Sequence, residues 1–373
     1  MKTDKIIVYY HDQKVGTLGL IKNTQQVAFQ YDENWIKTGF SISPLSLPLT
    51  NEVFVPQKSH FNGLFGVFAD SLPDAWGNIL LNRVVRKHNL KLDELNILDR
   101  LAIIGNSGMG ALTYKPVLLS IPSVKNINLD KIAEECHLIL TSEYSENIDD
   151  LFKLGGSSGG ARPKILTNIE NEDWIIKFPA HTDIRDIGIM EYKYYQCALL
   201  CGIKMSQSKL FKSNTCKGYF GTKRFDRVNN KRIHMISVAA LLETDFRVPN
   251  LDYHTFMKLT KVLTKNNPED VEQMFRIMCF NVFAHNRDDH AKNFSYLYDE
   301  TENRWHLSPA YDMTYSNTYY GEHSTTIDGN GLNPGKEELL NVGIKAGMNK
   351  NVCKKIMNDI QFIVNQELNE YIK

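Results

Sequence analysis

Aspartate and asparagine side chains gather in the stretch AHNRDDHAKNFSYLYD, which begins at residue 284. Asp288 and Asn293 are five residues apart, and Asp312 follows two strand-like runs that the sequence predicts to form a hairpin. In kinases a first aspartate accepts the proton of the attacking hydroxyl, and an asparagine and a later aspartate hold Mg²⁺. Mg²⁺ prefers hard oxygen ligands and keeps several waters, so two protein ligands suffice. The spacing therefore predicts a catalytic base at Asp288 and metal ligands at Asn293 and Asp312.

Further parts of a kinase site stand upstream of this stretch, in the order that kinases require. The small residues of GGSSGG, at 155–160, are suited to covering nucleotide phosphates. Lys177 ends the strand-like run WIIK, and Glu191, early in the next predicted helix, would orient that lysine. The run GTKRFDR, at 221–227, would present backbone groups to adenine. Together these parts predict an ATP site.

Each part also has a simpler interpretation. Glycine runs are usually flexible turns, and Ala161 and Arg162 replace the lysine and hydroxyl residue of a Walker A loop. A glutamate near a helix start usually favours the helix dipole. We expect His290 to hydrogen-bond within its loop rather than to act as a base. The acidic and amide side chains at 288, 293 and 312 resist such interpretations best, because a carboxylate beside a buried segment is costly unless a metal or a donor pairs it.

Composition and charge narrow the class of protein. Lys plus Arg equals Asp plus Glu at 43 each in 373 residues, so the chain itself is not expected to bind nucleic acid. No apolar run approaches the roughly 18 residues that a membrane span needs. The N-terminus resembles a strand and a turn rather than a signal peptide. The six cysteines form no CxxC pair. We therefore expect a soluble cytoplasmic protein with no membrane partner.

The pattern of elements predicts an α+β protein of three parts. Residues 1–120 mix strand and helix patterns and begin with a hairpin in KIIVYYHDQKVGTLGLI. Residues 121–225 carry the glycine-rich run and the lysine strand, and residues 226–373 are mainly helical. The run PEDVEQMFRIMCFNVFAHN is apolar on nearly every side, which predicts a buried helix. A β-rich segment followed by a helical one indicates two lobes with a cleft between them.

These motifs resemble the HipA-like serine/threonine protein kinases, the toxins of bacterial type II HipA/HipB toxin–antitoxin systems. The resemblance is carried by GGSSGGARPK, IIKFP, KRFDR, DDHAKNFS and PAYDM, and in the first part by SPLSLPL, FADSLPD and IGNSGMGAL. It covers nearly the whole chain. It implies a two-lobed protein-kinase-like fold with an extra N-terminal α/β subdomain and a mainly helical C-terminal lobe.

The resemblance also implies roles for single residues, with ATP and Mg²⁺ as cofactors. Asp288 matches the family's catalytic base, and Asn293 and Asp312 match its Mg²⁺ ligands. The positions that match ATP-binding residues are Lys177, the hinge residues Lys223 and Phe225, and the loop residues Gly156, Ser157, Ser158 and Gly159.

Regulation and partners follow from the same resemblance. In such kinases autophosphorylation of a serine in the glycine-rich loop switches the enzyme off. Ser157 matches that serine, but Ser158 follows where many relatives have proline or a small apolar residue, so both serines are candidates. The usual partner is a small helix-turn-helix antitoxin, through which alone the toxin would meet DNA. The usual targets lie in the translation machinery, aminoacyl-tRNA synthetases in particular, and their phosphorylation arrests growth and produces persistence.

Other functions are compatible with parts of the pattern. A small-molecule kinase of the aminoglycoside or choline type would share the Asp288 motif, but it would lack the motifs of residues 1–120. A co-repressor without catalysis would not need Asp288, Asn293 and Asp312. A metal-dependent hydrolase would need closely spaced histidines near DDH, and none is present.

Overall fold

The computed structural model describes residues 3–57, 60–119, 127–141, 145, 147–157, 159–180, 183, 186–229 and 231–372. The chain divides into two compact units, Met1–Gly188 with Phe211–Asp245, and Ile189–Leu210 with Phe246–Lys373. The predicted boundaries at residues 120 and 225 stay predictions. Among the proposed site residues, Ser158 lies outside the described part of the chain.

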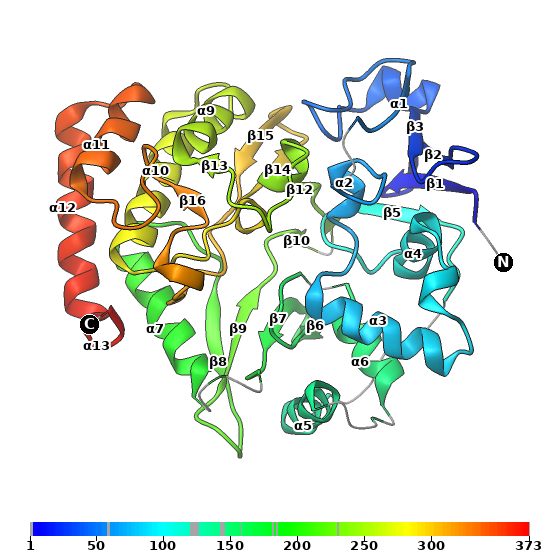
Figure 1. The fold of residues 1–373 in the computed structure, drawn as a ribbon, viewed down its shortest axis with the longest axis horizontal. Coiled ribbons are helices and arrows are strands. Elements are labelled where there is room, and N and C mark those ends of the chain that lie inside the picture. The colour runs from blue at the N-terminus through cyan, green and yellow to red at the C-terminus, as the bar shows by residue number, and fades with distance from the viewer. Residues whose placement is uncertain are drawn as a thin grey trace. The chain divides into compact units, whose positions relative to one another are not determined.

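The first unit begins with a five-stranded antiparallel sheet of order β4-β3-β2-β1-β5 (Figure 1). Alternate residues of β1 (Lys5–Tyr10) are buried, among them Ile6 and Val8, because successive side chains of a strand point to opposite faces. The turn at residues 11–12 joins β1 to β2 (Gln13–Leu20), so the predicted hairpin is confirmed. The remaining strands of this sheet are β3 (Val27–Tyr31), β4 (Val53–Phe54) and β5 (Leu112–Lys115).

The helices of this N-terminal part of the chain each have 13 residues or fewer. They are α1 (Glu33–Thr38), α2 (Gly66–Ala69), α3 (Ala75–Lys87), the 3-10 turn η1 (Leu92–Glu94) and α4 (Ile97–Ile104). Asn96 and Asp99 form a capping box at the start of α4, which satisfies backbone N–H groups that the helix leaves without partners.

A second sheet follows, in which β6 (Lys164–Ile169), β7 (Glu172–Lys177) and β9 (Tyr219–Lys223) pair antiparallel. Trp174 of β7, Ile165 of β6 and Trp76 of α3 belong to one buried core. The helix α3 and the second sheet of this unit therefore share a hydrophobic core.

The remaining elements of the first unit are α5 (Leu129–Leu140), α6 (Ile148–Gly155), β10 (Arg227–Val228), β11 (Lys231–Arg232), β12 (Met235–Ser237) and α8 (Val238–Leu241). The sequence analysis did not predict α6 and treated the glycine run at 155–160 as a flexible turn. The segment instead connects α6 to β6, because the apolar residues before it, Leu151 and Phe152, are buried on one face of a helix.

The second unit is mainly helical. Its elements are α9 (Tyr253–Leu263), α10 (Pro268–Phe283), η2 (Ala291–Asn293), η3 (Tyr319–Gly321), α11 (Lys336–Lys345), α12 (Lys350–Glu367) and α13 (Asn369–Ile372), with the short strands β13 (Leu251–Asp252) and β16 (Thr325–Thr326). The chain passes between the units within α7 (Ile187–Leu200), within β8 (Ser208–Phe211) and again after Asp245.

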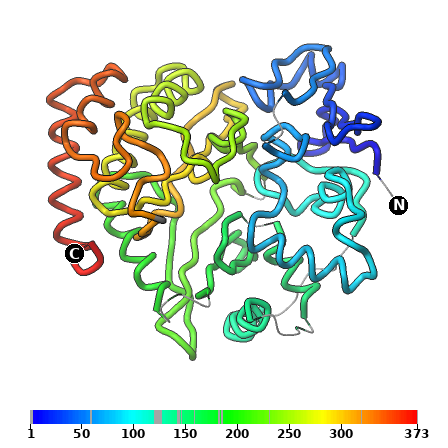
Figure 2. The backbone as a smooth tube through the Cα atoms, viewed as in Figure 1, coloured from blue at the N-terminus to red at the C-terminus, as the bar shows by residue number. Residues whose placement is uncertain are grey.

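The helix α10 is the centre of this unit, as the sequence predicted, and its buried residues occupy every side of its C-terminal half. Asn267 caps its start and Pro268 stands at its first position, which fixes where the helix begins. The helix α12 packs beside it and leads to the C-terminus (Figure 2).

The predicted hairpin after residue 293 is also confirmed. The strands β14 (Ser295–Asp299) and β15 (Arg304–Leu307) pair antiparallel, with Tyr298 opposite Trp305. None of the helices in the described ranges is long and apolar enough to cross a membrane.

Candidate active site

The loop between α10 and β14 holds two of the proposed site residues together. The side chain of Asp288 is 56% exposed, and its backbone carbonyl accepts a 2.8 Å hydrogen bond from Nδ2 of Asn293. The backbone N–H of Asn293 donates to the carbonyl of His290 at 2.9 Å, which closes the turn η2. The turn thus brings Asp288 and Asn293 into contact and leaves the Asp288 carboxylate at the surface.

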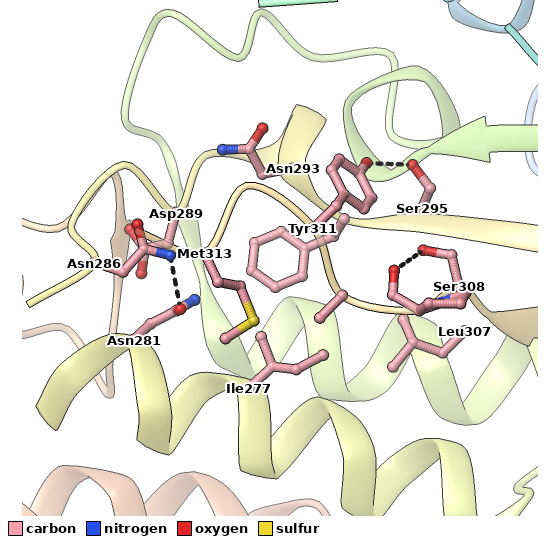
Figure 3. A pocket seen from close by; sticks show the side chains of 13 residues that line it. Ile277, Asn281, Asn286, Asp289, Asn293, Ser295, Leu307, Ser308, Tyr311 and Met313 are labelled. Carbon is pink, nitrogen blue, oxygen red and sulfur yellow. Dashed lines mark hydrogen bonds between the residues drawn. The ribbon is translucent and has the colours of Figure 1, made fainter. Parts of the chain in front are cut away.

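Asp312 stands on a segment that packs against the same turn. Its φ is 52°, a left-handed backbone conformation that is uncommon for a residue other than glycine and that clusters at functional sites. The hydroxyl of Tyr311 donates to the carbonyl of Lys292 at 2.8 Å. Met313 and Asn293 line one pocket, in which Met313 reaches toward Ile277 of α10 (Figure 3). The neighbours of Asp312 on both sides are therefore fixed beside the Asn293 turn.

Asp289 is buried, in contrast to Asp288. Its Oδ2 accepts a hydrogen bond from the Tyr253 hydroxyl and lies 2.9 Å from Nδ1 of His323, and its Oδ1 accepts from the Thr325 N–H at 3.1 Å. Only 1% of Asp289 and 5% of His323 is exposed. Burial raises the pKa of Tyr253 well above its usual value, and the charge of Asp289 adds to the effect. Asp289 thus anchors the loop through partners from other elements.

His290 lies beside the proposed base. Its Nδ1 accepts the N–H of Lys292 at 3.3 Å, and its Nε2 is 3.7 Å from Oδ1 of Asp288. Its ring centroid lies 5.1 Å from that of Phe246, and the Lys292 ammonium lies 5.2 Å from the same Phe246 centroid. His290 therefore contacts both the loop backbone and the side chain that would act as base.

The glycine-rich segment belongs to the first unit. Gly156 is the C-cap of α6, and the buried Ser157 donates a 2.6 Å hydrogen bond from Oγ to the carbonyl of Ser107. On the other side of the segment, the N–H of Gly160 donates to Oδ2 of Asp74 at 2.9 Å. A Cβ on Gly159 would lie 3.2 Å from the same carboxylate oxygen. The segment is held close to residues far earlier in the chain.

The lysines proposed for the nucleotide lie on the second sheet. Lys177 is half-buried at the end of β7, with its ammonium 5.7 Å from the Phe220 ring centroid. Lys223 ends β9 and forms a 2.6 Å ion pair with Glu172 on the adjacent strand, and Phe225 follows two residues later. Glu191 is buried in α7, within the second unit, so its pairing with Lys177 stays a prediction.

A cluster of charged residues follows β9. Asp226 accepts hydrogen bonds from Arg224 and Arg227 and from the N–H of Gly110. Arg227 and Arg232 also donate to backbone carbonyls in the loop at 106–110. We call Arg224, Asp226, Arg227 and Arg232 the arginine cluster. Burial by itself would raise the pKa of Asp226, but the two neighbouring guanidinium groups hold that pKa well below its usual range.

The arginine cluster and Asp74 were not identified as functional from the sequence. Their signals were present, because KRFDR, FADSLPD and IGNSGMGAL all occur among the stretches that carry the resemblance. Sequence spacing does not show that these stretches, at 68–74, 104–112 and 223–227, meet in space.

Comparison with family models assigns both parts of the chain. The model of the HipA N-terminal domain matches residues 6–115, and the model of the HipA-like C-terminal domain matches residues 156–367, more than half of the chain. The chain belongs to the HipA-like family.

Comparison with solved structures shows the fold. The HipA toxin of Shewanella oneidensis MR-1, solved with HipB and operator DNA, is 19% identical, with a TM-score of 0.73 over 98% of this chain and 90% of that one. The predicted α+β fold is thus confirmed as the HipA fold. The Helicobacter pylori proinflammatory kinase CtkA is 12% identical, with a TM-score of 0.39 over 56% of this chain and 91% of that one. The comparison with curated proteins gives no match.

The donor atoms at the 288–312 site suit a hard cation. The Nδ2 of Asn293 donates to the loop backbone, so Oδ1 is the atom that would bind a metal, and Asp312 would supply a carboxylate. Ligand atoms of Asp299, Glu302 and His306 also lie within 4.8 Å of one another, but Arg304 already pairs with Glu302 on that exposed hairpin turn. The better candidate for Mg²⁺ is therefore the pair Asn293 and Asp312.

Proposed function

We propose that this HipA-like protein is an ATP- and Mg²⁺-dependent protein serine/threonine kinase that acts as a growth-arresting toxin. The observation that carries the proposal is the geometry around the loop at 288–293. An exposed carboxylate, Asp288, stands on a rigid turn, with Asn293 bonded to its backbone and the Asp312 segment packed against the same turn.

Asp288 would accept the proton of the attacking hydroxyl. It needs to be open to substrate and fixed in position, and the loop meets both needs, because Asp289 anchors the backbone while Asp288 faces solvent. Asn293 and Asp312 would hold Mg²⁺, which neutralises charge on the nucleotide phosphates.

The first unit would bind the nucleotide. Lys177 would contact its phosphates, with the segment at 155–160 covering them and the Lys223–Phe225 backbone meeting adenine. In support, the Lys223 side chain is paired with Glu172, so the backbone is the part of this residue suited to a ligand.

Autophosphorylation at Ser157 or Ser158 would act as the off switch. The hydroxyl of Ser157 is buried and donates to the Ser107 carbonyl. A phosphoserine carries nearly two negative charges, and its oxygens accept rather than donate hydrogen bonds. A phosphate on Ser157 would therefore break the bond to Ser107 and force the segment out of its place.

A DNA-binding antitoxin is the proposed partner, because the Shewanella oneidensis HipA was solved with HipB and operator DNA. With 43 basic and 43 acidic residues, this chain would reach DNA only through that partner. The proposed substrate is a protein of the translation machinery, with aminoacyl-tRNA synthetases as the first group to test.

Calorimetric titration of the purified chain with ATP and Mg²⁺ tests the proposal. We expect Asp312→Asn and Asn293→Ala to weaken Mg²⁺-ATP binding at least tenfold, whereas Asp288→Asn binds as the parent does. Asp299→Asn, a carboxylate in the β14–β15 turn, serves as the matched control and should leave binding unchanged. Equal binding by all four variants would contradict the metal assignment, and a parent that binds no nucleotide would contradict the function.

A further inference from the structure

The start of α3 is capped by the glycine-rich segment. Asp74 is the N-cap residue of this 13-residue helix, but its side chain makes no capping hydrogen bond to the helix. Its Oδ2 instead accepts the N–H of Gly160 at 2.9 Å, and the N–H of Trp76 donates to the carbonyl of Gly160 at 3.2 Å. Both backbone groups of Gly160 are thus held by the first residues of α3.

Close packing supports these hydrogen bonds. The helices α3 and α6 pack together (Figure 1), and a Cβ on Gly77 would lie 2.5 Å from the carbonyl oxygen of Gly156. The indole Nε1 of Trp76 donates to the carbonyl of Lys164 at 3.2 Å, just beyond the segment. No side chain fits at position 77 without a shift, so the contact constrains the glycine-rich segment at Gly156.

The other side of the segment is held by the same N-terminal domain. Ser157 donates to the carbonyl of Ser107, and the loop around Ser107 is fixed by bonds from Arg227 and Arg232 to its neighbouring carbonyls. Asp74 and Ser107 both lie within the residues 6–115 that match the HipA N-terminal domain. The N-terminal domain therefore binds the segment at Ser157 and at Gly160.

We propose that Asp74 is a positioning residue that holds the glycine-rich segment in its nucleotide-binding conformation, so that the N-terminal domain sets the affinity for ATP. A carboxylate would repel phosphate groups, so its use here is to hold a backbone N–H, a charge-assisted bond that is stronger than a neutral one. This inference rests on the proposed function, in which the segment covers the nucleotide phosphates.

Two measurements on Asp74→Ala test the inference. The first is amide hydrogen exchange of peptides covering 155–161 in the absence of nucleotide. The second is the KM for ATP and the kcat of phosphoryl transfer. We expect faster exchange in this segment and a KM raised about tenfold, with kcat changed less than twofold; loss of a charge-assisted bond is of this size. Asp74→Asn, which keeps an acceptor oxygen without the charge, should lie between parent and alanine variant.

Asp32→Ala is the matched control. Asp32 is the N-cap of α1 in the same domain, and it accepts the N–H of Asn34 within its own helix and pairs with Lys14. The control should lose stability without changing exchange at 155–161 or the KM for ATP. An equal rise of KM in both variants would assign the effect to general destabilisation and overturn the inference.

Gly77→Ala tests the same contact between α3 and the glycine-rich segment through packing rather than a hydrogen bond. It replaces Asp74→Ala if that variant does not fold. Its Cβ would push against Gly156, so it should also raise exchange in the segment and the KM for ATP. Parent-like exchange and KM in either folded Asp74→Ala or Gly77→Ala would overturn the inference. If the parent binds no ATP, the proposed function fails, whereas the exchange measurement still decides whether Asp74 holds the segment.

Discussion

The arginine cluster and the loop at 285–293 look alike as sequence, since each crowds charged residues into about ten positions, but the structure treats them differently. In the arginine cluster Asp226 is fully buried and meets two guanidinium groups and a backbone N–H. In the loop, the side chain of Asp288 is more than half exposed, and His290 approaches it only to 3.7 Å.

This difference in burial distinguishes a carboxylate that stabilises the fold from one that is accessible to a ligand. A buried charge whose oxygens are all occupied by donors holds elements together and has no capacity left for a ligand. A carboxylate that is more than half exposed on a fixed backbone can be reached by a substrate. The loop places a buried aspartate, Asp289, beside an exposed one, Asp288, for which we propose the catalytic role.

The largest effect is expected from Asp226→Ala. Removing this carboxylate leaves the buried Arg224 and the partly buried Arg227 without their acidic partner, which should lower the free energy of unfolding of the first unit by about 3–5 kcal/mol. Asp288→Ala should change stability by less than about 0.5 kcal/mol, as surface substitutions do. Thermal and urea unfolding of both variants would show the contrast, and similar losses in the two would break the comparison.

Asp289→Asn should have the next largest effect. It removes the charge that faces His323 and Tyr253 and disturbs three buried hydrogen bonds, at a cost of about 1–3 kcal/mol. Urea unfolding followed by the near-ultraviolet signal would measure the loss. A stability equal to that of Asp288→Asn would mean that the two neighbouring aspartates are alike, against their burial.

A moderate fall in pH should lower the stability of the first unit through His234. This side chain is buried and lies 2.9 Å from the Ile42 carbonyl. Burial lowers the pKa of His234 to about 4, although the Ile42 carbonyl opposes this. Below the unfolded pKa of about 6.5 the unfolded chain takes up a proton that the folded one does not, so stability falls as the pH drops from about 6.5 to 4.

The loss between pH 7 and pH 6 should be about 0.7 kcal/mol for this group. His234→Gln, which keeps a donor for Ile42, should flatten the change of melting temperature over this interval. Parallel pH profiles for parent and variant would contradict the assignment to His234.

The smallest change in the free energy of unfolding is expected from Lys223→Met. The ion pair with Glu172 is about one-third exposed, so its loss should cost no more than about 0.5 kcal/mol. Nucleotide affinity should stay within twofold of the parent, because only the backbone of this residue is assigned to adenine.

Lys177→Met, in contrast, should weaken nucleotide binding by at least tenfold. The reverse ranking of the two variants in a fluorescence titration would exchange the roles of the two lysines.

Local patterns predicted much of the fold. The alternation in β1 and β2, the apolar surface of α10 and the turn residues between β14 and β15 each determine a structure within a few neighbouring residues. The family resemblance supplied the rest of the architecture. The helix α6 was missed because its eight residues follow an acidic stretch and run directly into glycines.

Long-range contacts were beyond the reach of sequence patterns. The bond from Asp74 to Gly160 spans 86 residues, and the bond from Gly110 to Asp226 spans 116. The residues next to Asp288 and Asp289 in the sequence do not indicate which of the two is buried. The burial of Asp289 depends on Tyr253 and His323, which come from other parts of the chain.

The most direct test of the account is peptide mass spectrometry of the purified chain after incubation with ATP and Mg²⁺, with Asp288→Asn treated in parallel. The account predicts a phosphate on Ser157 or Ser158 in the parent and none in the variant. Equal phosphorylation of the two proteins would contradict the role of Asp288, and a parent that neither binds ATP nor gains phosphate would contradict the kinase assignment itself.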